Sequence, residues 1–247
     1  MPSLAAYDQR LDYSYAPGIF PAMEALTHRP QCVRRVLVHS QGQEGVEKLT
    51  ALAEEKGIRV EVADRALSRV SGKENCYAAA VFGKFSDTLS PRQPHVVLHC
   101  PSDSGNVGTI LRTALGFGVE DVALIRPCVD LFDPRTVRAT MGALFSLRLH
   151  VYDRFEDYRA DFPSHTLYPF MLTGSTALEE ALSAAPPERW TLIFGNEGSG
   201  LPDSFSTLGR AVRIPSNDRV DSLNLAVAAA IGIYAFTAAQ RGGDRRE

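Results

Sequence analysis

The stretch that decides the fold runs from Phe194 to Pro202 and reads FGNEGSGLP. It continues the apolar run that starts at Trp190, which has the length and composition of a buried strand. Glycines let backbone N–H and C=O groups come close to a ligand, as a small nucleoside-containing cofactor requires. Taken alone, the pattern is equally typical of a glycine-rich turn, because short glycine patterns recur by chance. Its meaning depends on the rest of the chain.

Two other segments place polar residues where an apolar run ends. Ser102 to Arg112 follows one predicted strand, and Ser222-Leu223-Asn224 comes shortly after Ile214-Pro215. Ligands of open parallel sheets bind outside the carboxyl ends of the strands, so the three segments together predict one binding site. A simpler interpretation stays open for the polar side chains, because Asn106 and Ser222 are also suitable helix N-caps. Arg112 lies too far along its helix to be a cap, although it is suited to a surface salt bridge.

The periodicity of apolar residues predicts an α/β protein. The expected strands are 33–39, 58–62, 77–82, 95–100, 122–125, 144–151, 166–172 and 190–194. The expected helices are 44–56, 64–70, 106–117, 133–141, 177–183 and 222–240. The last helix is apolar on nearly all sides and is expected to be buried. This alternation is typical of a mostly parallel sheet covered on both faces.

A polar stretch with two prolines, residues 86–94, reads as a linker. We therefore expect a small N-terminal domain over residues 1–90 and a larger domain over 91–247. The first dozen residues lack periodicity and are expected to form an arm or a short helix.

Composition narrows the class of protein. The chain has 247 residues, 45% of them hydrophobic, and a net charge of −3, which neither supports nor excludes RNA as a partner. No stretch approaches the ~18 apolar residues of a membrane helix, and the start lacks the order of a signal peptide, so we expect a cytoplasmic protein without membrane contact. Four separated cysteines predict reduced thiols and no metal site: Cys32, Cys76, Cys100 and Cys128.

Two common nucleotide-binding classes are disfavoured. The loop reads GxxGxG late in the chain, whereas a dinucleotide fingerprint reads GxGxxG after a first strand. The chain also contains no GxxxxGK followed by Ser or Thr, so a phosphate-binding P-loop is not expected.

The order of the three segments resembles the TrmH-type (SpoU) branch of the SPOUT superfamily of RNA ribose 2′-O-methyltransferases. Ser102 to Arg112 is similar to motif one, Phe194 to Pro202 to motif two, and Ile214 to Ala230 to motif three, within a similarity that spans 95–240. The part before the linker is more loosely similar to the family's ribosomal-protein-like substrate-binding domain. Motif three departs mildly from the common pattern, because Leu225-Ala226 follows the asparagine where valine-serine is more frequent.

The resemblance implies a fold, a cofactor and an assembly. It implies a SPOUT-type parallel sheet whose C-terminal segment forms a trefoil knot, S-adenosylmethionine as cofactor, rRNA or tRNA as substrate, and a homodimer with the site near its interface. The family's cofactor-binding positions map onto five residues of this chain: Gly195, Asn196, Gly198, Ile214 and Leu223.

The resemblance also assigns catalytic positions. Arg112 matches the family's essential arginine, which we expect to bind an RNA phosphate and orient the ribose hydroxyl, because a guanidinium with a pKa above about 12 is a poor base. We expect Glu197 to hold Arg112 or the ribose. Three further residues are expected to orient these groups: Asn106, Ser222 and Asn224.

Three arginines after motif one are candidates for an RNA phosphate track: Arg135, Arg138 and Arg148. Two other functions stay open, namely a catalytically silent RNA-binding module of the same fold and a methyltransferase that acts on an RNA base.

Overall fold

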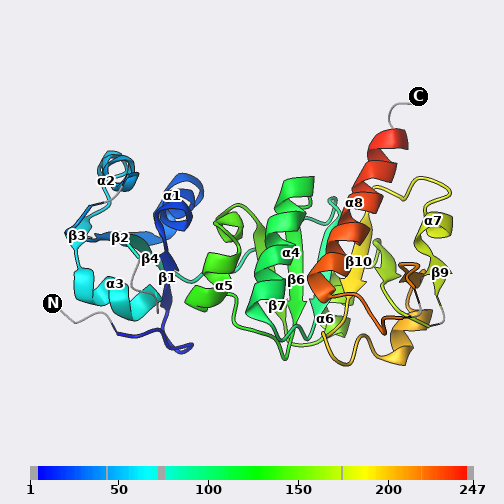
Figure 1. Ribbon diagram of the computed structural model, residues 1–247. Coiled ribbons are helices and arrows are strands. Elements are labelled where there is room, and N and C mark those ends of the chain that lie inside the picture. Colours follow the sequence, from blue (N-terminus) through cyan, green and yellow to red (C-terminus); the bar gives the residue numbers. More distant parts are fainter. Residues whose placement is uncertain (1–4, 43, 72–75, 174, 218, 244–247) are drawn as a thin grey trace. The chain divides into compact units, whose positions relative to one another are not determined.

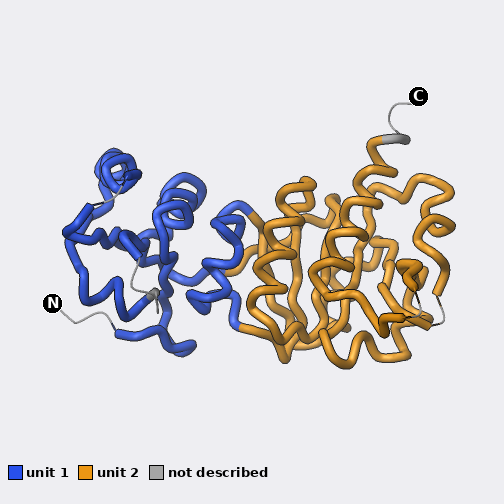
Figure 2. Tube along the Cα trace, in the orientation of Figure 1, with its two compact units in different colours: residues 1–85, 130–146 blue, residues 86–129, 147–247 orange. Residues whose placement is uncertain are grey.

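The structure is a computed structural model that describes residues 5–42, 44–71, 76–173, 175–217 and 219–243. The chain divides into two compact units (Figure 2). Unit 1 contains Met1–Phe85 and Asp130–Ser146, and unit 2 contains Ser86–Val129 and Leu147–Glu247. The functional domains expected from the sequence, 1–90 and 91–247, stay a prediction. As packing units, the two parts differ from that division by the segment 130–146, which belongs to unit 1.

Unit 1 is built on a mixed four-stranded sheet in the order β1-β4-β2-β3 (Figure 1). Its strands are β1 (Tyr13–Pro17), β2 (Val33–Val38), β3 (Val60–Val62) and β4 (Ala78–Gly83). Its helices over the first 85 residues are α1 (Ile19–His28), α2 (Val46–Glu55) and α3 (Asp64–Ser71), with a 3₁₀ turn at η1 (Pro30–Cys32). The sequence patterns found β2, β3, β4, α2 and α3 but not β1 or α1. Residues 5–12 form no helix, and the first four residues lie outside the described part of the chain.

The second segment of unit 1 holds α5 (Pro134–Ala139) and η2 (Ala143–Phe145). It completes an aromatic cluster in which the rings of Phe82 and Phe145 meet edge to face at 5.0 Å and those of Phe85 and Phe132 at 5.2 Å. The strand predicted for 144–151 was wrong at its start, because Gly142 has φ +87° and leads into the 3₁₀ turn. The strand itself, β7, begins only at Arg148.

Unit 2 contains a five-stranded, fully parallel sheet in the order β7-β6-β5-β10-β8. Its strands are β5 (His95–His99), β6 (Asp121–Ile125), β7 (Arg148–Tyr152), β8 (Thr166–Pro169) and β10 (Trp190–Phe194). A short parallel pair, β9 (Thr176–Ala177) and β11 (Val212–Arg213), lies beyond β8, and two short elements connect the strands here, α7 (Leu178–Ala181) and η3 (Asp203–Thr207). The predicted α/β fold with a parallel sheet is confirmed.

Helices cover both faces of this sheet. On one face α4 (Ser104–Phe117) and α8 (Leu225–Gly243) pack side by side (Figure 1). On the other face α6 (Phe155–Asp161), which the sequence patterns missed, places Phe155 and Tyr158 against Val97 and Ile193. Strand side chains alternate between the two faces, so the sheet is apolar on both sides.

The final helix is less buried than expected. Ala229, Ile233 and Phe236 form its fully buried stripe, with the spacing of one helical face. Val227 and Tyr234 are 48% and 57% exposed, so the prediction of burial on nearly all sides was wrong. Within the described ranges, no helix is both long enough and apolar enough to cross a membrane.

Candidate active site

The glycine-rich segment after β10 folds into a tight turn. Asn196 and Gly200 exchange two backbone hydrogen bonds of 3.2 and 2.9 Å, and the Asn196 side-chain oxygen accepts from the backbone N–H groups of Gly198 (2.9 Å) and Ser199 (3.1 Å). A Cβ atom at Gly195 would lie 2.2 Å from the carbonyl carbon of Gly200. Gly195 is therefore required by a close backbone approach, whereas Gly200 is required by its φ of +67°.

Glu197 connects this turn to the beginning of α4. One carboxylate oxygen accepts hydrogen bonds from the backbone N–H (2.9 Å) and hydroxyl (2.7 Å) of Ser102, and the other accepts from the Asp103 N–H (3.0 Å) and the Asn106 amide (3.2 Å). Burial raises the pKa of Glu197, but these hydrogen bonds outweigh it and lower the pKa to about 2. The carboxylate is therefore ionised at neutral pH.

Asn106 and Asn224 connect α4 to the beginning of α8. The Asn224 side-chain N–H donates to the Asn106 side-chain oxygen at 3.0 Å. The Asn224 oxygen accepts from the N–H groups of Ala226 (2.9 Å) and Val227 (3.3 Å), which makes Asn224 the cap of α8. The hydrogen-bonded series Glu197–Asn106–Asn224 thus joins all three sequence motifs.

Both capping interpretations are wrong in detail. Asp103, not Asn106, caps α4 by accepting from the Asn106 N–H at 2.7 Å, and this leaves the Asn106 side chain available for Glu197 and Asn224. Ser222 lies three residues before α8 and does not cap it.

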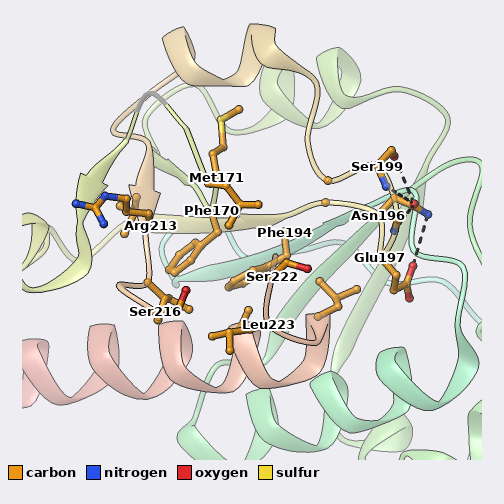
Figure 3. A pocket seen from close by; sticks show the side chains of 18 residues that line it. Phe170, Met171, Phe194, Asn196, Glu197, Ser199, Arg213, Ser216, Ser222 and Leu223 are labelled. Atoms are coloured by element: carbon orange, nitrogen blue, oxygen red, sulfur yellow. Dashed lines mark hydrogen bonds between the residues drawn. The ribbon is translucent and has the colours of Figure 1, made fainter. Parts of the chain in front are cut away.

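The turn and motif three enclose a cavity of about 220 Å³ (Figure 3). Seven of the predicted site residues line it: Gly195, Asn196, Glu197, Gly198, Ile214, Ser222 and Leu223. Figure 3 shows Phe170 and Phe194 side by side in its middle, where their ring centroids are 4.5 Å apart. Asn196, Glu197 and Ser199 lie toward one end, and Arg213 lies toward the other.

Sequence reasoning missed the aromatic wall of this cavity. Phe170 and Met171 follow β8, whose sequence carries no polar signal. The indication that they had a role was topological, because β8 is the parallel neighbour of β10 and both strands end at the same edge of the sheet.

Arg112, Asn106 and Asn224 do not line the cavity. Arg112 is exposed on α4, about 9 Å along the helix axis from Asn106. Within the described residues its guanidinium has no ion pair or hydrogen bond, so the expected Glu197–Arg112 contact is not present: the carboxylate is committed to the start of α4. The guanidinium is accordingly available to a substrate.

Two arginines of the expected phosphate track form ion pairs with acidic side chains. Arg148 is bound to the buried carboxylate of Asp121 at 2.6 Å and to Glu120 at 3.1 Å, and Arg135 is bound to Asp133 at 2.8 Å. These two charges are already compensated by acids. Among the described side chains, no three His, Cys, Asp or Glu residues gather in a way that could hold a metal ion.

A doubly covered parallel sheet with three motif loops meeting at one edge places the chain in a known class of protein. It belongs to the SpoU rRNA Methylase family, whose model matches residues 93–234. The chain is 33% identical over 135 residues to Ribosomal RNA small subunit methyltransferase G 2 of Syntrophobacter fumaroxidans, covering 55% of this chain but only 25% of that protein.

Two further similarities extend over more of the chain. A 23S rRNA (adenosine(1067)-2′-O)-methyltransferase from Streptomyces laurentii is 28% identical over 195 residues, which is 75% of this chain and 72% of that protein. The crystal structure of an AdoMet-bound rRNA methyltransferase from Sinorhizobium meliloti superposes with a TM-score of 0.79 at 26% identity, covering 94% of this chain and 88% of that one.

Proposed function

We propose that this protein transfers a methyl group from S-adenosylmethionine to a ribose 2′-hydroxyl of ribosomal RNA. The observation that carries the proposal is the series Glu197–Asn106–Asn224, which joins the three motif loops around one cavity. Membership of the SpoU rRNA Methylase family and the named activity of the Streptomyces laurentii relative support the reaction class.

The cavity residues fit this cofactor. Phe170 and Phe194 offer apolar faces of the kind that a purine ring packs against. The ionised Glu197 carboxylate, at one end of the cavity, complements a positive sulfonium. The Gly195–Gly200 turn together with Ile214, Ser222 and Leu223 would hold the adenosine part, and the bound cofactor supplies an electrophilic methyl group.

The chain's own residues then perform positioning. Arg112 binds the phosphate next to the target nucleotide through its two-pronged guanidinium and orients the ribose hydroxyl. A guanidinium stays protonated, so the hydroxyl loses its proton to water. Glu197 acts as a positioning residue, because it fixes the start of the helix that carries Asn106 and Arg112.

The proposal includes a homodimer formed through the face of α4 and α8. Val227 and Tyr234 expose large apolar side chains there, and the Tyr234 ring lies 5.6 Å from that of Phe117 on α4. Val227→Asp is expected to convert a dimer into a monomer in analytical ultracentrifugation, whereas a wild type that sediments as a monomer would contradict the proposed homodimer.

The trefoil knot and the cytoplasmic location that we expect from the sequence stay predictions.

The test is the transfer of labelled methyl from S-adenosylmethionine to unmodified rRNA and tRNA transcripts, followed by digestion to nucleosides. Wild type is expected to label ribose 2′-O positions of rRNA. Arg112→Ala is expected to lower kcat by about 10²-fold while leaving the cofactor Kd unchanged, because Arg112 does not line the cavity. Arg154→Ala is the control, since that arginine is exposed and paired with Asp157.

The outcomes separate the alternatives. Label on a base would identify a base methyltransferase, and label on tRNA alone would reassign the substrate. Cofactor binding without labelling of any transcript would contradict the proposed reaction. A chain that binds RNA but not the cofactor would be a silent RNA-binding module.

A further inference from the structure

A second hollow lies at the opposite end of the unit 2 sheet from the cofactor cavity, at the amino end of β8. It has a volume of about 440 Å³ and is lined by Arg159 of α6, by the segment 162–167 that leads into β8, and by 208–210. The cofactor cavity begins at Phe170, just past the carboxyl end of β8, whereas this hollow lies at the amino end of the same strand. Only Tyr168 and Pro169 separate the two linings, so Leu167 and Phe170 lie about 10 Å apart along the strand.

The walls of this hollow are positively charged. Arg159 and Arg210 line it, and no aspartate or glutamate does. In the part of the chain that the structure describes, neither guanidinium has an ion pair, and that of Arg210 is hydrogen-bonded to the side chain of Tyr168, a neutral partner that leaves its charge uncompensated. By contrast, Arg154 on the same helix as Arg159 is held by Asp157 at 3.1 Å, and Arg126 is held by Asp153 at 3.4 Å.

A third arginine adds to this charge. Arg189 donates to the Ser164 hydroxyl at 3.4 Å and has no acidic partner among the described residues. Burial lowers the pKa of the neighbouring His165, and the charge of Arg189 lowers it further. His165 is therefore neutral at physiological pH, and the positive charge of the site comes from the arginines.

The backbone holds Arg210 in place. Its N–H donates to the Leu167 carbonyl oxygen at 2.9 Å, and a Cβ atom at Gly209 would lie 2.2 Å from that same oxygen. Segment 208–210 thus lies directly against β8, which only a glycine permits. Arg210 is presented from a fixed position rather than from a free loop.

We propose that Arg159 and Arg210, with Arg189 beside them, form a phosphodiester-binding site that holds the RNA backbone away from the methylated nucleotide. Uncompensated guanidiniums around one hollow repel each other and are best balanced by an anion with several acceptor oxygens. Phosphates along a nucleic-acid strand are spaced by roughly 3.4 Å of helix axis, so about 10 Å corresponds to about three nucleotides. This inference rests on the proposed function, because RNA is the polyanion that the protein is proposed to bind.

The test compares two double variants of the full chain that remove the same charge. Arg159→Ala/Arg210→Ala removes the proposed site, and Arg126→Ala/Arg154→Ala removes two acid-paired arginines. The first variant is expected to bind an rRNA transcript on the order of tenfold more weakly at 0.1 M salt and to reduce the slope of log K against log salt by about 2. The control is expected to match wild type. The charge-preserving pair Arg159→Lys/Arg210→Lys should retain most of the slope, and cofactor affinity should be equal in all four proteins.

A second readout needs no RNA. Inorganic phosphate is expected to shift the backbone amide resonances of Thr166 and Leu167 in wild type and in the control, but not in Arg159→Ala/Arg210→Ala. Equal salt slopes in the two double variants would overturn the inference, even if the wild type methylates rRNA. If the wild type methylates no RNA, the proposed function fails separately, and unshifted Thr166 and Leu167 amides would then overturn the phosphate site as well.

Discussion

Asn224 uses the two ends of one side-chain amide for different purposes. Its oxygen caps α8, and its N–H group donates to Asn106 in the series that joins the motif loops. The cap contributes to stability, whereas the donated bond contributes to the arrangement of the site. The two contributions can therefore be separated by substitution.

Asn224→Asp keeps the capping oxygen but loses the donor. We expect it to unfold in urea within about 0.5 kcal/mol of wild type, because aspartate is an equally good N-cap. Its methyl-transfer rate should fall at least about tenfold, since a carboxylate repels the Asn106 oxygen. Asn224→Ala should lose both the capping oxygen and the N–H donor, so its free energy of unfolding should be about 1 kcal/mol lower than that of wild type. Equal activity of wild type and Asn224→Asp would show that the Asn106 bond is not needed.

Glu197→Gln tests the charge at the centre of the series. A neutral amide accepts more weakly from the Ser102 and Asp103 groups, so we expect a loss of about 2 kcal/mol at pH 7. The folded pKa of about 2 lies below the ordinary 4.5, so the carboxylate stabilises the fold above pH 4.5 and this contribution is lost as the pH falls toward 2. Urea titrations should therefore give a constant difference between the two proteins above pH 4.5 and a shrinking one below. A constant difference down to pH 3 would argue against a lowered pKa.

At the residue level, the sequence was a better guide to which polar side chains lie close together than to which groups they form hydrogen bonds with. Glycine spacing indicated the turn at Gly195, but the partner of Glu197 was expected to be Arg112 and is the start of α4. The choice of cap between Asp103 and Asn106 depends on where the helix begins. A difference of three residues in that boundary exchanges the roles.

At the level of elements, α8 is both a wall of the core and a support for the cavity. Gly232 lies in its middle, and a Cβ atom there would come within 2.7 Å of the Phe170 ring and 3.1 Å of the Phe194 ring. Both rings line the cofactor cavity. The helix can approach them this closely only because position 232 has no side chain.

Gly232→Ala is expected to push these rings toward the cavity. The gain of up to ~1 kcal/mol from helix propensity is outweighed by overpacking, so we expect a net loss of about 1–2 kcal/mol and weaker cofactor binding. Gly116→Ala on α4 is the matched control: no atom lies within 4 Å of its Cβ position, and it should gain about 0.5–1 kcal/mol with unchanged binding. Calorimetric cofactor titration and thermal unfolding measure both effects. Equal cofactor affinity of the two variants would contradict the supporting role of Gly232.

Strands and helices were predictable where apolar residues extend over the whole element, as in β2 and β10. The helix α6 was missed because only Phe155 and Tyr158 are buried on it, which are too few to define a helical period. β1 and α1 were missed because each contains a proline, Pro17 at the end of β1 and Pro21 in the first turn of α1, and a proline is typical of a turn or break. Tertiary packing, not local preference, decides such short elements.

At the scale of the whole molecule, unit 2 contains a buried polar network at the amino ends of its strands. His95 is fully buried, with its ring nitrogens 2.9 Å from the Tyr158 hydroxyl and 2.7 Å from the Ser90 carbonyl oxygen. The ring of His165 lies 4.3 Å from that of His95. Burial, followed by the charge that His165 would carry, lowers the pKa of His95 to about 4.

This network predicts a loss of stability in mild acid. The folded pKa of His95 is below the ordinary 6.5, so the unfolded chain binds more protons than the folded chain between pH 6.5 and 4. The free energy of unfolding therefore decreases as the pH is lowered from 6.5 to 4. One histidine contributes a slope of up to about 1.4 kcal/mol per pH unit. His95→Gln should reduce the measured slope in urea unfolding. Identical slopes in wild type and variant would exclude His95 as the source.

Unit 1 is discontinuous in sequence, and this affects when it can fold. The rings of Phe82 and Phe85 have their partners Phe145 and Phe132 on a segment that is translated only after β5, α4 and β6 of unit 2. While the ribosome is still reading those elements, the N-terminal sheet lacks one side of its aromatic cluster. Unit 1 therefore reaches its final packing only once residue 146 has emerged, by which time three elements of unit 2 are already outside the ribosome.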